Sequence, residues 1–390
     1  MERRRFLLEN LSRCATLSEL RRTEFFARCS QEIEELLSQA RIVRCPEAVP
    51  RLKSFLRVAQ WNLEKGVRFA QILETLRSDE ALKWADIILL NEADAGMSRS
   101  GNRDVACELA ESLGMHMIFG AAHLELTGGN PDAEGENQGS LQGNAVLSRY
   151  PVREARIIPL PTCFEPYEFL EKRYGRRNCV WACLAVGNRA WWVGSTHLEV
   201  RNTPRCRALQ MRRIMEALPG EDHEPHLLGG DFNSNTFLRG TPWRTLAAAW
   251  RLAMNSPSKM QAELIRPYAG KEPLFQVAHA AGFSWKEFNS HEPTACAPLE
   301  GLEDARLLPK WVRRSIQKRL DRYHGYLSLK LDWFLARNAR ALTEKEMRDS
   351  DSGVFSAAPG RVAVIRKGPN RLSDHSPIYT DLRLVTIEGA

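Results

Sequence analysis

Short apolar runs recur along the chain from residue 55 onward, and they predict β-strands. The runs cover residues 55–59, 87–90, 145–147, 180–186, 191–193, 226–228, 329–335 and 378–385. Several of them alternate apolar and polar side chains, as strands with one buried face do. Apolar residues at helical spacing lie between some of the runs, at residues 103–113 and 205–218. Many strands with few helices between them favour an α/β sandwich over a regular βαβ series.

Residues 1–50 follow a different pattern. Apolar side chains fall at broadly helical spacing in the segment 18–40, which contains no glycine or proline: Leu20, Phe25, Phe26, Ile33, Leu36 and Leu37. This pattern predicts one or two helices. Pro46 and Pro50 then interrupt the chain before the first predicted strand. We therefore expect a helical extension over residues 1–50, followed by one large domain over residues 51–390.

Two segments of the large domain lack a strand pattern. Residues 127–143 are rich in glycine and are predicted to form a loop. Residues 255–328 contain no clean series of strands. We interpret this second segment as an insertion between two strands.

The composition is that of an ordinary globular protein, with 43% hydrophobic and 26% charged residues. No stretch approaches the roughly 18 unbroken apolar residues of a membrane-spanning helix. The first residues are basic, but Glu9 and Asn10 interrupt the apolar run after Leu8, which makes a poor signal peptide. We therefore expect a monomeric, cytoplasmic protein without a transmembrane segment.

The cysteines give no sign of a metal site. There are nine of them, an odd number, and none forms a CxxC pair. Cys179 and Cys183 are four residues apart, but no second pair completes a zinc site. We expect reduced and mostly buried thiols, which fits a reducing cytoplasm.

Polar residues stand at or beside the ends of the predicted strands, where burying each one alone would be costly. They are Asn62, Glu64, Glu92, Asn144, His197, Asp231, Asn233, Asp332, Asp374 and His375. Gathered at one edge of the sheets, these side chains could satisfy one another and hold a cation. Oxygen ligands suit a hard ion such as Mg²⁺ or Mn²⁺, which neutralises phosphate charge and helps to activate water. The pattern therefore predicts a divalent-metal-dependent phosphoesterase.

Taken singly, these residues have ordinary structural explanations. An isolated His197 or His375 is more often a hydrogen-bonded histidine of the core or surface than a catalyst. Asn62 and Asn144 are common turn formers. No P-loop or GxSxG motif is present, which argues against an NTPase or a serine hydrolase. The prediction of a phosphoesterase therefore rests on finding all of these residues together in one sequence.

The same residues lie in seven short motifs. They are Trp61-Asn62, Asn91-Glu92, Gly143-Asn-Ala-Val-Leu-Ser-Arg149, Thr196-His-Leu198, Gly230-Asp-Phe-Asn233, Leu331-Asp-Trp-Phe334 and Ser373-Asp-His375. In this order they resemble the endonuclease/exonuclease/phosphatase superfamily, which includes DNase I, abasic endonucleases of the exonuclease III type, neutral sphingomyelinases, inositol polyphosphate 5-phosphatases and deadenylases. The resemblance spans residues 55–386 and implies a DNase I-like, four-layer α/β/β/α sandwich.

The resemblance also implies a metal site. Glu92 is then the principal ligand, with Glu64 and Asp374 as further ligands. Asn62 lies near the ion and binds the substrate. Glu64 departs from the pattern, because abasic endonucleases have an aspartate there and other members have no carboxylate.

Further roles follow from the resemblance for the residues of catalysis. Asp231 polarises the attacking water, and Asn233 orients that water. Asp332 and His375 form a hydrogen-bonded pair at the phosphate. His197 stabilises the transition state or protonates the leaving oxygen.

The phosphate pocket is less completely matched. Asn144 lines it according to the resemblance. The tyrosine that abasic endonucleases place on the phosphate has no clear counterpart. Candidates for that region are Tyr174, Arg173, Arg176 and Arg177.

Three functions remain open. The first is a nuclease that cleaves DNA or RNA by metal-assisted attack of water. The second is a phosphatase or phosphodiesterase for a lipid or small phosphorylated substrate, such as a phosphoinositide, sphingomyelin or a nucleotide. The third, a non-catalytic binding protein on the same fold, is disfavoured because no site residue is clearly missing. The net charge of +7 suits a polyanion and favours the nuclease.

Residues 306–330 are strongly basic, with eight lysines and arginines against the single acid Asp321. Val312, Ile316 and Leu320 give this segment one apolar stripe, so it predicts an amphipathic helix with a basic face. Such a helix could pack on the sandwich as a solvated element. It could also guide a polyanion toward Asp332, or contact a membrane surface.

Overall fold

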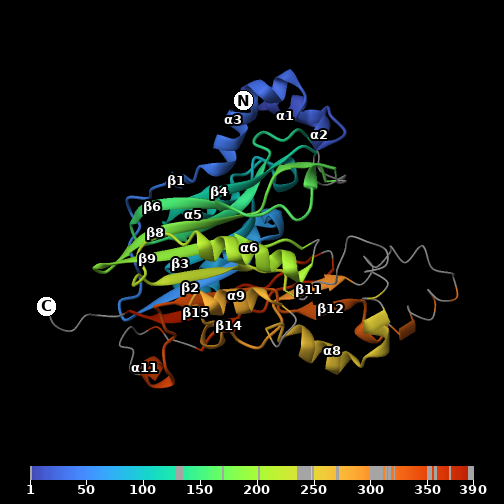
Figure 1. Cartoon of the computed structure of the whole chain (residues 1–390). Coiled ribbons are helices and arrows are strands. Elements are labelled where there is room, and N and C mark those ends of the chain that lie inside the picture. Colours follow the sequence, from blue (N-terminus) through green and yellow to red (C-terminus); the bar gives the residue numbers. More distant parts are fainter. Residues whose placement is uncertain are drawn as a thin grey trace.

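The computed structural model describes most of the chain. The described residues are 2–127, 135–168, 171–200, 203–234, 247, 250–268, 272–298, 311, 314, 318–319, 321–348, 354, 358–368 and 370–384. Two β-sheets lie face to face in the middle of the molecule, with helices on their outer sides (Figure 1).

The first sheet has eight strands in the order β1-β4-β5-β3-β2-β15-β14, with β7 paired to β4. The second sheet has five, in the order β13-β10-β9-β8-β6, and β11 and β12 form a separate pair. The strands are β1 (Arg41–Val43), β2 (Phe55–Asn62), β3 (Ile87–Ala95), β4 (His116–Glu125), β5 (Leu141–Ser148), β6 (Val152–Pro159), β7 (Arg173–Gly175), β8 (Asn178–Val186), β9 (Arg189–His197), β10 (His226–Asp231), β11 (Ala295–Pro298), β12 (Tyr326–Leu329), β13 (Asp332–Arg337), β14 (Gly360–Arg361) and β15 (Ile378–Arg383).

The helices cover the sheets and extend the chain at its start. They are α1 (Glu2–Ser12), α2 (Leu17–Leu20), α3 (Glu24–Ser38), α4 (Phe69–Ser78), α5 (Val105–Leu113), α6 (Pro204–Glu216), α8 (Pro257–Leu264), α9 (Leu274–Ala280) and α11 (Glu344–Arg348). Helices α4 and α5 pack on the outer face of the first sheet, and α6 and α9 pack on that of the second. The four-layer α/β/β/α sandwich predicted from the sequence is confirmed.

Apolar side chains from both sheets fill the space between them. Val58 and Leu89 of the first sheet belong to the same buried cluster as Val180 and Phe334 of the second. Fully burying a side chain of this size contributes roughly 1.5–3 kcal/mol. Strand β2 is buried on both faces, which explains why its run reads as almost continuously apolar.

The second strand in the chain pairs with the last one. Strand β15 lies antiparallel to β2, with Asp381 opposite Arg57. Both side chains are buried, and Arg57 donates from Nε and Nη2 to the two carboxylate oxygens of Asp381 at 2.7 Å each. This bidentate pair joins residues 324 positions apart.

The predicted strands all have counterparts, with differences in detail. The run at 329–335 contains a break, because β12 ends at Leu329 and β13 begins at Asp332. Strands β1, β4, β6, β7, β11 and β14 were not predicted. In β6 the buried positions are few and its arginines and glutamate are interspersed, so its pattern resembles a surface segment.

The N-terminal helices pack against one edge of the first sheet. Leu11 and Ile33 lie in one buried cluster with Tyr167 and Tyr174. Helix α3 begins after Thr23, whose side chain accepts from the backbone N–H of Phe26, as an N-cap does. The segment 18–40 therefore does contain helices, and residues 1–50 also include β1, which pairs with β4.

The expectation of reduced thiols is wrong for two cysteines. Cys163 and Cys206 form a disulfide, with their Cα atoms 6.1 Å apart. It ties the segment before β7 to helix α6. A separation of 43 residues gives no local signal of pairing, since only the fold brings the two together. Among the seven free cysteines, those at 14, 29, 179, 183 and 296 are buried.

The predicted basic helix falls largely outside the described residues. Residues 306–310, 312–313, 315–317 and 320 are among those not described. Trp311, Arg314, Lys318 and Arg319 are exposed. Lys330, the last of the basic residues in this segment, is only 1% exposed. Among the described helices, none is long and apolar enough to cross a membrane.

Candidate active site

The predicted site residues gather where the two sheets meet at their strand ends. Asn62 pairs with Asn91 between the parallel strands β2 and β3. In the second sheet, Asp231 lies opposite His197 on one side and Asp332 on the other. Parallel strands end at the same edge of a sheet. The polar residues that follow the apolar runs of β2 and β3, and of β9 and β10, therefore lie close together at that edge.

Asn91 links the two sheets at this edge. Its Oδ1 accepts from the backbone N–H of Asp231 at 2.8 Å, and its Nδ2 donates to the carbonyl of Thr196 at 3.2 Å. The same Nδ2 donates to Oδ1 of Asn144 at 2.9 Å. Asn91 is fully buried, so these bonds satisfy its amide and fix the spacing between the strand ends.

Glu92 owes its direction to a β-bulge. Leu90 pairs with Ala145 and Ala93 pairs with Gly143, so two residues of β3 lie opposite one residue of β5. Glu92 has φ of +54°, a left-handed conformation that is costly for a non-glycine residue. A bulge of this kind re-aims a side chain, and here it turns the carboxylate toward the neighbouring sheet.

Asp231 depends on the glycine before it. Gly230 has φ of +150°, and a Cβ atom there would lie 1.8 Å from the carbonyl oxygen of Thr196. Strands β9 and β10 therefore approach too closely for any side chain at this position. The close approach brings His197 next to Asp231.

The carboxylate of Asp231 is buried inside a ring of polar groups. Its Oδ2 accepts from Nδ2 of Asn62 at 3.1 Å and lies 3.3 Å from Nε2 of His197 and 3.6 Å from Nε2 of His375. Its Oδ1 accepts from the backbone N–H of Asn233 at 2.9 Å. Burial raises the pKa of Asp231 to about 7, while the neighbouring His375 holds it back. A carboxylate with this pKa can accept and return a proton near neutral pH.

His375 forms the predicted pair with Asp332. Its Nδ1 lies 2.8 Å from Oδ2 of Asp332, and both side chains are buried. Burial alone would lower the pKa of His375, but the carboxylates of Asp332, Asp231 and Asp374 together raise it well above its usual value. His375 is therefore a cation at neutral pH, with Nε2 directed toward Asp231.

Arg177 fixes the tautomer of His197. Its Nη1 lies 2.8 Å from Nδ1 of His197. Because a guanidinium has only donors, Nδ1 must accept, and the ring proton is on Nε2, which faces Asp231. Burial and then the charge of Arg177 lower the pKa of His197 well below its usual value. His197 is thus a neutral donor, unlike the cationic His375.

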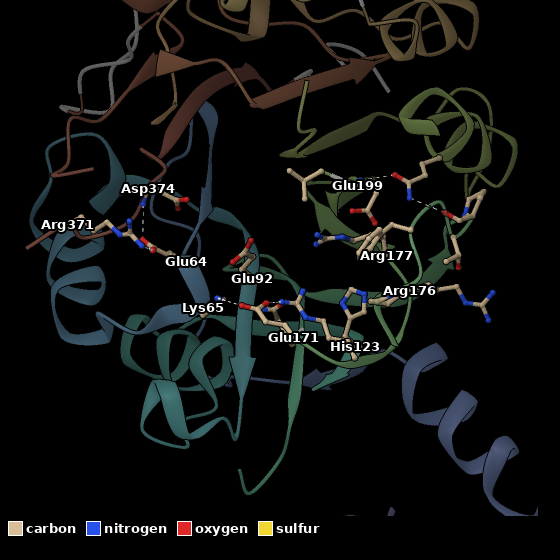
Figure 2. A pocket seen from close by; sticks show the side chains of 18 residues that line it. Glu64, Lys65, Glu92, His123, Glu171, Arg176, Arg177, Glu199, Arg371 and Asp374 are labelled. Carbon is tan, nitrogen blue, oxygen red and sulfur yellow. Dashed lines mark hydrogen bonds and ion pairs between the residues drawn. The ribbon is translucent and has the colours of Figure 1, made fainter. Parts of the chain in front are cut away.

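A pocket of about 390 Å³ opens beside these residues. Glu64, Glu92 and Asp374 lie at one end of it (Figure 2). Oε2 of Glu64 accepts from the backbone N–H of Asp374 at 3.0 Å, and Arg371 pairs with Oε1 of Glu64. Of the predicted site residues, only Glu64, Glu92 and Asp374 line this pocket; its described lining does not include Asn62, Asn144, His197, Asp231, Asn233, Asp332 or His375.

The comparisons with known proteins agree with this arrangement. The family model described as the Endonuclease/Exonuclease/phosphatase family matches residues 59–375. The chain belongs to this family. Members of the superfamily are hydrolases that act on phosphoester bonds, and they generally depend on a divalent metal.

The solved structures to which the chain is similar have low sequence identity to it. A family protein from Leptotrichia buccalis is 12% identical, with a TM-score of 0.47 over 84% of this chain and 100% of that one. One from Bacteroides vulgatus is 14% identical, with a TM-score of 0.46 over 85% and 100%. The human Nocturnin catalytic domain is 16% identical, with a TM-score of 0.44 over 89% and 97%. No curated protein matches the chain significantly.

Two groups of side chains have the chemistry to hold the divalent ion of the family. The first is Glu64, Glu92 and Asp374, which offer only oxygen ligands, as Mg²⁺ prefers. Burial raises the pKa of Glu64, and the charge of Asp374 raises it further. Burial likewise raises the pKa of Asp374, with Glu92 adding to the shift. Carboxylates crowded in this way would be relieved by a cation.

The second group is Asp231, Asp332 and His375, whose potential ligand atoms all lie within 4.8 Å of one another. Within this group His375 already lies between two carboxylates, those of Asp332 and Asp231. Its Nδ1 is also occupied by Asp332. Among the described residues, this second group is the only one whose ligand atoms lie so close together, whereas the first group offers oxygen ligands alone.

Sequence reasoning placed one residue differently and missed two others. Asn144 was expected to line the phosphate pocket, but its Nδ2 donates to Oδ1 of Asn178 at 2.9 Å and its Oδ1 accepts from Asn91. It connects strands rather than facing the pocket. Arg177 was named only as one of several candidates, and His123 was not named. His123 lies in β4, which was not predicted as a strand.

Burial of the charged Lys330 lowers the stability of the fold, and this effect can be measured. Its Nζ has no hydrogen-bond partner among the described residues and lies 4.6 Å from the centre of the Trp333 ring. Burial lowers its pKa from 10.5 to about 8. Below pH 8 the buried group must be charged, so folding pays the full penalty, which disappears as the pH rises past 10.5.

Replacing Lys330 by methionine should therefore raise the free energy of unfolding at pH 7 by about 1–3 kcal/mol. Urea denaturation of both proteins at pH 7 and at pH 10.5 would measure this difference. The difference in the free energy of unfolding between the variant and the wild type should shrink toward zero at the higher pH. An equal difference at both pH values would show that packing, not charge, is responsible.

Proposed function

We propose that the protein is a divalent-metal-dependent phosphodiesterase that cleaves DNA or RNA by attack of water. The observation that supports it most is the position of Asp231. This carboxylate is 2% exposed, lies between a neutral histidine donor and a cationic one, and stands beside the carboxylate end of the pocket. A base and two donors around one small volume are what hydrolysis of a phosphoester requires.

The chain's own groups have distinct roles in this proposal. Asp231 accepts a proton from the attacking water, and its raised pKa of about 7 suits that task. Asn62 and the backbone N–H of Asn233 hold the carboxylate in place. His375, kept charged by Asp332, stabilises negative charge on the phosphate.

His197 offers its Nε2 proton to the phosphate or to the leaving oxygen, since Arg177 keeps the proton on that nitrogen. The side-chain amide of Asn233 donates to the carbonyl of Leu198 at 2.9 Å, so this residue acts by holding the loop after β10.

Glu92, Glu64 and Asp374 would hold the metal, which we propose to be Mg²⁺ or Mn²⁺. When bound, the ion supplies charge neutralisation at the phosphate and helps to ionise water.

A nucleic acid is the substrate that the charge favours. The chain carries a net charge of +7, and Lys65, Arg173, Arg176 and Arg177 line the pocket. A second candidate is a small phosphorylated molecule. The pocket volume of about 390 Å³ supports it, since small-molecule sites occupy roughly 300–1,000 Å³.

A substrate panel tests the proposal and separates these candidates. Plasmid DNA, single-stranded DNA, RNA, a phosphoinositide, sphingomyelin and bis-p-nitrophenyl phosphate would each be incubated with Mg²⁺ or Mn²⁺. We expect hydrolysis of the nucleic acids and of bis-p-nitrophenyl phosphate, with complete loss on addition of EDTA. Cleavage that persists in EDTA, or no cleavage of any substrate, would contradict the proposal.

A further inference from the structure

The pocket has a second end, opposite the carboxylates. Arg177 and His123 lie there (Figure 2), and Phe164 and Thr162, from the segment that carries Cys163, also line the pocket. The disulfide from Cys163 to α6 holds this segment in place. The two ends belong to one continuous cavity, so one molecule can reach both.

Arg177 brings a positive charge to this end of the pocket. The one hydrogen bond of its side chain among the described residues goes to the neutral ring of His197. Within the described residues, Arg177 takes part in no ion pair, although its side chain is only partly exposed. A guanidinium has five N–H donors in a fork that suits carboxylates and phosphates, so most of its donors remain available to a ligand.

His123 adds a buried polar group that lacks a partner. The residue is 4% exposed, and its Nδ1 has no hydrogen-bond partner among the described residues. Figure 2 shows its ring directed into the pocket from β4. Burial and then Arg177 lower its pKa well below the usual value, so the ring is neutral. A neutral imidazole can donate one hydrogen bond to a ligand oxygen.

The other cations of the pocket are already paired. Arg173 lies 3.0 Å from the buried carboxylate of Glu125 and also pairs with Glu171. Lys65 lies 3.9 Å from Glu171. Arg176, which is 46% exposed, pairs with Glu34 of α3 at 3.1 Å and points away from the pocket centre in Figure 2. Among the described cations that line the pocket, Arg177 is therefore the one without an ion pair.

The carboxylates of the pocket form no ion pair with Arg177 among the described residues, although its charge helps to lower the pKa of Glu92. Glu64, Glu92 and Asp374 belong to the metal end, and Glu171 is shared between two cations. Glu199 also lines the pocket and is 7% exposed. With a divalent ion bound at the carboxylates, both ends of the cavity present positive charge to a ligand.

We propose that Arg177 and His123 form a second phosphate subsite, which binds a phosphate group carried by the same molecule as the scissile phosphoester. The inference rests on the proposed function, because it names the chemistry of the substrate at that site. It narrows the substrate to molecules with two phosphate groups a short distance apart. Such a group could be the next phosphate of a nucleic-acid strand or the second phosphate of a small bisphosphorylated molecule.

A matched pair of ligands tests the subsite by binding, without hydrolysis. Thymidine 3′,5′-bisphosphate and thymidine 5′-monophosphate differ by one phosphate. Their dissociation constants would be measured by titration calorimetry in Ca²⁺, which also takes oxygen ligands. We expect the bisphosphate to bind at least about 10-fold more tightly, the scale of one hydrogen-bonded charge pair.

Two variants address the subsite, and a third is a matched control. Arg177→Gln and His123→Leu should each reduce the preference for the bisphosphate to within about threefold, since each removes one contact. Arg176→Gln removes the same charge from the neighbouring residue, but this residue is paired outside the pocket. The preference of Arg176→Gln for the bisphosphate over the monophosphate should stay near that of the wild type. Circular dichroism would verify that each variant is folded.

The outcomes separate this proposal from the function on which it rests. Equal affinity of the wild type for the two ligands, or an equal loss in Arg176→Gln and Arg177→Gln, would overturn the subsite. Hydrolysis of bis-p-nitrophenyl phosphate, which carries one phosphate, reports on the proposed function alone. A bisphosphate preference without any hydrolysis would leave the subsite standing and reject the function.

A third ligand identifies the source of the second phosphate. Trithymidylate carries its phosphates as internal diesters. If its affinity also depends on Arg177, the subsite accepts the adjacent phosphate of a nucleic-acid strand. If only the bisphosphate shows this dependence, the subsite accepts a terminal phosphate of a small molecule.

Discussion

Replacing Glu92 by glutamine is expected to lower kcat by at least about 10³-fold while the fold remains intact. A bound divalent ion contributes several kcal/mol to transition-state stabilisation, and about 1.4 kcal/mol corresponds to a factor of ten in rate. Burial alone would raise the pKa of Glu92, but the charges of Lys65 and Arg177 outweigh it and hold the pKa below its usual value. Glu92 is therefore ionised, and glutamine removes the charge while keeping the shape.

Initial rates on bis-p-nitrophenyl phosphate across a Mg²⁺ titration would measure this effect. The variant should require a much higher Mg²⁺ concentration for half-maximal rate. Glu171→Gln is the matched control, because Glu171 lines the same pocket but pairs with Arg173. Its Mg²⁺ midpoint should equal that of the wild type. A wild-type midpoint and rate in Glu92→Gln would remove Glu92 from the metal site.

Replacing Asp231 by asparagine is expected to lower kcat by about 10²–10⁴-fold, the range for loss of a general base. Asparagine has nearly the same volume, so packing around the side chain should change little. It cannot accept a proton, and its amide must lie against the Nδ2 donor of Asn62 or the Nε2 donor of His197. The loss should therefore appear in kcat and not in the Mg²⁺ midpoint.

The pH dependence gives this prediction a second measurement. A base must be unprotonated to act, so the wild-type rate should rise with pH through about 7, where Asp231 titrates. The rising limb should be absent in Asp231→Asn. Combining this change with His375→Asn should cost less than the product of the two single losses, because both residues serve one proton network. An unchanged pH profile would exclude Asp231 as the base.

The two variants together decide where the ion binds. If Glu92→Gln shifts the Mg²⁺ midpoint and Asp231→Asn does not, the ion lies with Glu64, Glu92 and Asp374. The reverse result would place it with Asp231, Asp332 and His375, whose ligand atoms also lie close together.

Much of the site could be predicted because its residues follow apolar runs, although β3 itself continues past Glu92 to Ala95. Glu92 follows the run of residues 87–90, and Asp231 follows that of residues 226–228. A strand that ends in a polar residue has to place that residue at the edge of the sheet. The apolar runs also predicted the two sheets, because strands buried on both faces, such as β2, stand out from the rest of the sequence.

Other parts could not be predicted because they depend on contacts between distant residues. Arg177 lies among several basic residues, and nothing in the sequence shows that it faces His197 when Arg176 faces Glu34. The pairing of Cys163 with Cys206 depends on the approach of α6 to the segment before β7. Asn144 was misplaced because a motif gives a residue's neighbourhood but not the direction of its amide.

The pairing of β2 with β15 also affects how the protein is made. The ribosome synthesises residues 55–62 long before residues 378–383. For most of synthesis, β2 therefore lacks its partner strand β15. During that time Arg57 has no Asp381 to pair with, and burying an unpaired guanidinium is costly. The first sheet can close only after the last strand has left the exit tunnel. A nascent chain that stopped just after His375 would contain every proposed catalytic residue and still lack a site. Interrupted synthesis should therefore yield a substrate for chaperones and proteases, not a weakened enzyme.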